Sequence, residues 1–99
     1  MRKNPAIDVV GIEKLEEELQ KQYLAGSLSG EGERILLIKF HKKMDVDSKI
    51  AVKSLGGTIR ADLSRLCRLG ISLPENKIVA LAGFLCIQEI NEDLQGTLA

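Results

Sequence analysis

The residue types that most often carry catalysis are sparse in this chain and stand apart from one another. The two cysteines, Cys67 and Cys86, are far apart in the sequence and form no CxxC pair, so they provide neither a zinc site nor a disulfide framework. The single histidine, His41, is followed by two lysines, which disfavour its protonated form. We therefore expect two reduced thiols, no catalytic residue, no metal site and no cofactor, and we predict that the protein is not an enzyme.

Two glycine-rich stretches could present backbone N–H groups to an anion. Residues 30–33 read Gly-Glu-Gly-Glu, but the glutamates would repel phosphate and no Gly-Lys-Ser/Thr follows. Residues 56–58 read Gly-Gly-Thr beside Arg60, and a helix starting there could hold an anion on its free N–H groups. We favour the simpler interpretation, in which residues 56–57 are a hinge or a turn between helices.

Charge is balanced over the whole chain but not along it. Fourteen basic and 14 acidic side chains cancel, which argues against a general attraction to nucleic acid or to a membrane. Residues 34–70, however, carry nine basic and three acidic side chains. The candidate contacts to an anion or a nucleic acid are Lys39, Lys42, Lys43, Lys49, Lys53, Arg60, Arg65 and Arg68. The alternative is a solvated face that acidic helices on either side balance.

Residues 62–72 fit the first helix and the turn of a helix-turn-helix, with Gly70 in the turn. The helix that would follow is apolar, and its only side chain suited to reading bases is Gln88, far from the helix start. A nucleic-acid-binding transcriptional regulator is therefore the alternative function, and it would use the basic segment 34–70 instead of a recognition helix.

The most apolar stretch, residues 78–87, contains no charged residue. It is too short for the roughly 20 residues that span a bilayer, so we expect no membrane partner. A helix that is apolar all round is normally buried all round, and a partner would cover it more easily than one small domain could. We predict a homodimer or a protein partner here, with the interface at Ile78, Leu81, Ala82, Phe84, Leu85 and Ile90.

The elements that would position these residues are predicted to be helices. We expect a first helix from residue 4 to residue 26, a loop over 26–32, and a helix beginning at Asp45 or Asp47. Residues 35–40 fit either a helix or a strand, and we favour a helix because no other segment is strand-like. Residues 58–70 fit a further helix, and Ser72 with Glu75 forms a capping box that would start the last one. Residues 97–99 would be a frayed tail.

Together these elements predict an all-α fold, a single domain of 99 residues built as a bundle of four or five helices. Hydrophobic residues make up 44% of the chain, too many for a disordered protein. No secretory signal is recognisable at the start, which favours the cytoplasm. We expect a small interaction protein (a regulator, an anti-activator or a chaperone-like accessory factor) that binds a protein partner through its apolar last helix.

Overall fold

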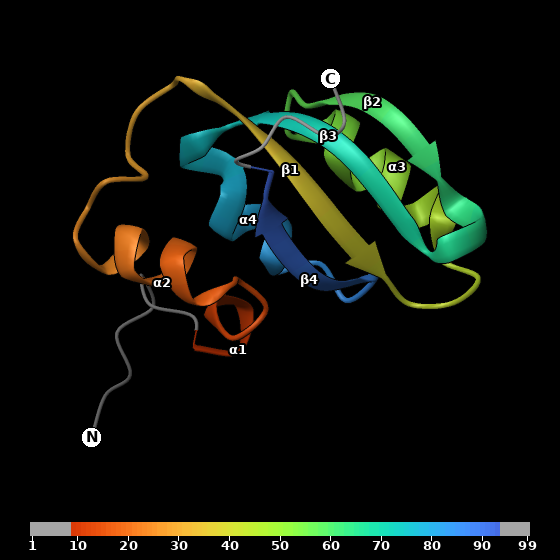
Figure 1. Ribbon diagram of the computed structural model, residues 1–99, viewed down its shortest axis with the longest axis horizontal. Coiled ribbons are helices and arrows are strands. Elements are labelled where there is room, and N and C mark those ends of the chain that lie inside the picture. Colours follow the sequence, from red (N-terminus) through yellow and green to blue (C-terminus); the bar gives the residue numbers. More distant parts are fainter. Residues whose placement is uncertain (1–8, 94–99) are drawn as a thin grey trace.

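The computed structural model describes residues 9–93 and shows a mixed α/β fold (Figure 1). Its elements are α1 (Val9–Ile12), α2 (Glu17–Leu24), β1 (Glu33–Phe40), α3 (Asp45–Ser54), β2 (Thr58–Leu63), the 3-10 helix η1 (Ser64–Leu66), β3 (Arg68–Pro74), the 3-10 helix η2 (Glu75–Lys77), α4 (Ile78–Ala82) and β4 (Ile87–Glu92). The four strands form one sheet in the order β2-β3-β1-β4, with every neighbouring pair antiparallel.

The prediction of an all-α bundle is wrong, and β1 shows why. Leu36, Ile38 and Phe40 are buried, whereas the residues between them are partly exposed, which is the alternation of a strand with one covered face. Leu36 and Phe40 are four residues apart, a spacing that fits a helix as well as a strand. The helix that we favoured for residues 35–40 is therefore this central strand, and three further strands exist to pair with it.

Residues 58–73 form a hairpin and not a helix. Strands β2 and β3 pair antiparallel, and η1 with Cys67 closes the turn between them. Cys67 has the left-handed conformation (φ 57°) that such turns require. Gly70 lies within β3, opposite Leu37 and Ala61, so the helix-turn-helix interpretation is wrong.

The last predicted helix is much shorter than expected. Ser72 belongs to β3 and makes no helix cap, α4 covers only Ile78–Ala82, and the chain then turns into β4. The predicted first helix is broken into α1 and α2, whereas the helix predicted to begin at Asp45 or Asp47 is confirmed as α3, which begins at Asp45. The expected helix start at residues 4–5 and the expected tail at 97–99 lie outside the described residues.

One face of the sheet carries the hydrophobic core. Side chains from β1, β3 and β4 pack there against α3, α4 and three leucines nearer the N-terminus, Leu15, Leu19 and Leu28. Figure 1 shows α3 and α4 behind the sheet. Residues 14–16 lie along the outer edge of β4, because Leu15 bridges Ile90 in parallel. The order β-α-β-β-α-β with interleaved strands is the split βαβ arrangement of ferredoxin-like proteins. Within residues 9–93, no helix is long and apolar enough to cross a membrane.

Candidate functional site

The second face of the sheet is covered by no helix or strand among the described residues. Strand pairing places three rows of side chains on this surface, which we call the open face. The first row is Thr58, Ser72 and Ile35; the second is Ala61, Gly70, Leu37 and Asn91; the third is Leu63, Arg68, Lys39 and Glu89. The open face therefore draws on all four strands and is positioned by the whole fold.

The rows of the open face differ in chemistry. Ile35 and Leu37 give its middle an apolar surface and are half-buried, with small residues beside them in both rows. The third row is charged, and Lys39 lies directly opposite Arg68 on the neighbouring strand. Like charges placed opposite each other are unfavourable within a sheet, so this pair does not stabilise the fold.

The open face carries no aromatic side chain among residues 9–93. Phe40 is buried in the core, Phe84 follows α4, and Tyr23 lies in α2. Sheets that bind single-stranded nucleic acids stack bases on aromatic rings. The open face lacks that feature and offers aliphatic side chains instead.

The interface residues predicted from the sequence are divided between the core and the surface. Ile78, Leu81, Ala82 and Ile90 are completely buried, at 0% exposure. Phe84 and Leu85 lie in the turn between α4 and β4 and are 37% and 86% exposed. This small domain buries most of the apolar residues 78–87 by itself, because they do not form one helix. Residues 78–82 are helical, residues 83–86 form a turn, and β4 begins at Ile87.

The eight predicted anion-contact residues do not form one patch. Lys39 and Arg68 meet on the open face, whereas Lys42 and Lys43 are exposed in the β1–α3 connection. The others lie on α3 (Lys49 and Lys53), on the edge strand β2 (Arg60) and in the hairpin turn (Arg65). The structure therefore joins two of the eight residues by strand pairing and distributes the rest over other elements.

Lys49 is already paired with a carboxylate of its own chain. Its Nζ lies 2.8 Å from Oδ2 of Asp62 and links α3 to β2. The pKa of Asp62 is lowered to about 2 by the hydrogen bond from Lys49 and by two hydrogen bonds from Ser64. The hydrogen bond with Asp62 correspondingly raises the pKa of Lys49. This ion pair holds α3 against β2 and leaves Lys49 less available to bind an anion from outside the chain.

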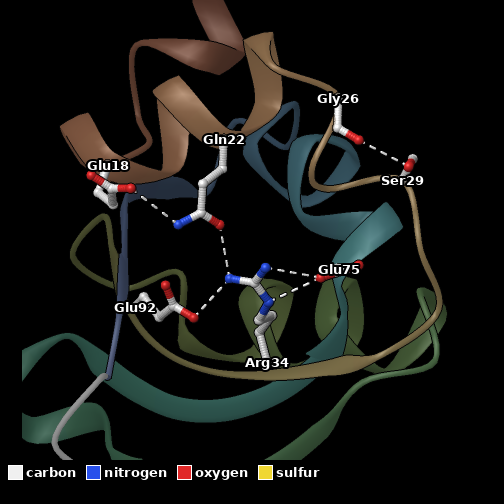
Figure 2. A network of polar contacts seen from close by, with 7 residues as sticks. All are labelled: Glu18, Gln22, Gly26, Ser29, Arg34, Glu75 and Glu92. Atoms are coloured by element: carbon white, nitrogen blue, oxygen red, sulfur yellow. Dashed lines mark hydrogen bonds and ion pairs between the residues drawn. The ribbon is translucent and has the colours of Figure 1, made fainter.

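Arg34 is the centre of a polar cluster that the sequence did not reveal (Figure 2). Its Nη1 donates to Glu92 at 2.8 Å and to Gln22 at 2.9 Å, and its Nε donates to Glu75 at 3.0 Å. Burial lowers the pKa of Arg34, but the hydrogen bonds and charges of Glu92 and Glu75 outweigh that effect and raise it. Arg34 thus joins β1 to α2, η2 and β4 and is a structural residue.

A shallow hollow of about 410 Å³ lies at the hairpin end of the sheet. Its lining residues are Asp62, Leu63, Arg65 and Leu66. Leu63 belongs to the third row of the open face, so the hollow adjoins that surface. Leu66 is 62% exposed, which adds an apolar group at the same end of the molecule.

The cysteines and His41 gather around the end of β1 without forming a reactive group. The N–H of Phe40 donates to the carbonyl of Cys67, and the N–H of His41 donates to that of Cys86. The cysteines therefore lie on opposite sides of β1, about two strand spacings or roughly 10 Å apart, which exceeds disulfide reach. Within residues 9–93, no three side chains of His, Cys, Asp or Glu come together as a metal site.

Comparison of the sequence with protein-family models and with curated proteins finds no match. The fold adds little on its own, because the split βαβ arrangement supports many unrelated functions. The function therefore has to be inferred from the surfaces that the fold leaves uncovered.

Proposed function

We propose that this chain is a small protein-interaction domain that binds a protein partner through the open face of its sheet. The observation that carries the proposal is the contrast between the two faces. One packs against α3, α4 and residues of the N-terminal part of the chain, whereas the other keeps Ile35 and Leu37 half-exposed at its centre. An uncovered apolar patch with a polar border is typical of a binding surface.

The size of the open face sets how the partner would contact it. Four strands about 4.8 Å apart and five residues of about 3.3 Å each cover roughly 14 by 13 Å. A stable interface needs about 800 Å² of buried surface on each partner. The contact would therefore extend beyond the three rows, and the hollow beside Leu63 with exposed Leu66 offers the nearest additional apolar surface.

The chemistry of the open face favours a protein over a nucleic acid. Aliphatic side chains at the centre match the apolar core of a protein interface, and the lack of aromatic rings removes the usual platform for bases. The acidic Glu89 in the third row would also repel a phosphate backbone.

The proposal is tested by affinity capture with two matched variants. Leu37→Gln removes apolar surface from the middle of the open face, whereas Leu85→Gln makes the same change in the exposed turn after α4. Partners captured by the unaltered protein and by Leu85→Gln should be lost with Leu37→Gln. Circular dichroism would confirm that both variants fold.

A parallel measurement of molar mass by light scattering determines whether the partner is a second copy. Dimerisation that Leu37→Gln abolishes would place the second copy on the open face. Dimerisation or capture that only Leu85→Gln abolishes would contradict the proposal and assign binding to the α4–β4 turn.

A further inference from the structure

We infer that Lys39 and Arg68 together bind a carboxylate of the protein partner, so that the open face recognises an acidic, partly apolar protein surface. This inference rests on the proposed function and adds the chemistry of the partner to it.

Within the described part of the chain, neither Lys39 nor Arg68 takes part in an ion pair. By contrast, Arg34 is paired with Glu75 and Glu92, and Lys49 is paired with Asp62. Among residues 9–93, no ion pair or side-chain hydrogen bond involves Lys39 or Arg68. Their donors remain available although strand pairing places them directly opposite each other.

Lys39 and Arg68 also lie on β1 and β3, the two central strands of the sheet. Both side chains are half-buried, and charges at such sites are less screened by salt than fully exposed ones. The planar guanidinium of Arg68 can hold both oxygens of a carboxylate, while the ammonium of Lys39 adds a point charge. An acidic group would relieve the repulsion between the two cations.

Glu89 lies opposite Lys39 on β4 and restricts the negative charge that this row can bind. One carboxylate between Lys39 and Arg68 would leave the row with balanced charge, because Glu89 supplies the second negative charge. A polyanion such as a nucleic acid would bring further phosphates toward Glu89 and be repelled. The row is therefore suited to an isolated Asp or Glu.

The neighbouring row specifies what lies next to that carboxylate. Leu37 is two residues before Lys39 in β1, so the apolar contact and the cationic site are about 6.6 Å apart along the strand. One helical turn, about 5.4 Å, or two residues of a strand spans that distance. The partner would thus present an apolar side chain and an acidic one at adjacent positions of the same element.

The test uses a phage-displayed library of random dodecapeptides selected against the folded protein. Selected peptides should be enriched in Asp or Glu beside an apolar residue. Their affinity, measured by fluorescence anisotropy, should fall about tenfold with Arg68→Gln and further with the double variant Lys39→Gln/Arg68→Gln. The control Lys53→Gln/Lys77→Gln removes two exposed cations outside the open face and should leave binding unchanged. The melting temperature of Arg68→Gln should equal or exceed that of the unaltered protein.

The outcomes separate this inference from the proposed function. Peptides that lose binding with Leu37→Gln, but lack acidic residues and ignore Arg68→Gln, would overturn the inference and leave the proposed function standing. Failure to select any peptide sensitive to Leu37→Gln would overturn both. Binding of a deoxythymidine dodecamer that shifts the amide resonances of Lys39 and Arg68 would also overturn the inference, since it would replace the acidic protein with a nucleic acid.

Discussion

Replacing Arg34 with methionine should destabilise the protein strongly, because it leaves two carboxylates without a cation. The side chains of Arg34, Glu75 and Glu92 are only 23%, 17% and 10% exposed. Net contributions of hydrogen bonds to charged groups are about 1.5–3 kcal/mol each, and breaking a buried ion pair costs about 3–5 kcal/mol. Allowing for partial exposure, we expect a loss of about 2–4 kcal/mol.

The assay is urea denaturation followed by circular dichroism, with thermal melting beside it. For a chain of this size the expected loss lowers the melting temperature by roughly 10–30 °C. The stability of Arg34→Lys should lie between that of Arg34→Met and that of the unaltered protein. Lysine keeps the charge but cannot donate to Glu75, Glu92 and Gln22 in the same fixed geometry. The control Arg60→Met changes an exposed arginine of the edge strand. Equal stability of Arg34→Met and Arg60→Met would refute the assignment of Arg34 as a structural centre.

Three further predictions follow from local geometry. Gly57→Ala should lower the free energy of unfolding by about 1–3 kcal/mol, because its Cβ would lie 2.8 Å from Val52 and 2.9 Å from a backbone oxygen. In the control Gly32→Ala the Cβ meets nothing within 4 Å, so this variant should be as stable as the unaltered protein in the same denaturation assay. A comparable loss in both variants would contradict this packing. Lys43→Gly should stabilise the protein by up to about 1 kcal/mol in thermal melting, because the lysine has φ 70° and glycine adopts that conformation without steric cost; a loss of stability would count against it. The depressed pKa of Asp62 implies stability that is fully present above about pH 4 and is lost as the pH falls toward 2. Carbon-detected NMR should show this carboxyl titrating near pH 2, and its pKa should rise toward 3.8 in the Lys49→Met variant; an unchanged value there would be evidence against the ion pair.

The part of the fold that the sequence predicted correctly is the part with strong local signals. Helix α3 begins at Asp45 and is followed by Gly56, whose φ of +84° marks the turn into β2. Acidic residues in a first turn and a glycine after the last turn are local features of a helix. Such signals depend only on neighbours in the chain, and this explains why they could be interpreted without the structure.

The strands were missed because their patterns coincide with helical ones over short distances. In β3 the large apolar residues Leu69, Ile71 and Leu73 occupy every second position, but Gly70 and Ser72 between them, which are buried as well, were interpreted as helix-ending and helix-starting residues. Both lie in the interior of the sheet, paired with residues of β1 and β2. Strand pairing with β1 and β2 decides the structure here, and pairing is a contact between distant segments.

The candidate site likewise could not be assembled from composition. The basic segment 34–70 contains both paired and unpaired cations. Arg34 and Lys49 form ion pairs within the described residues, whereas Lys39 and Arg68 do not. Charge counting treats all four alike. Alternation along β1 places Arg34 and Lys39 on opposite faces, because their positions in the sequence differ by an odd number. The register of β1 against β3 then brings Lys39 to Arg68 across 29 positions of sequence. A shift of one residue would exchange the faces of a strand, so the register determines which cations remain available to a partner.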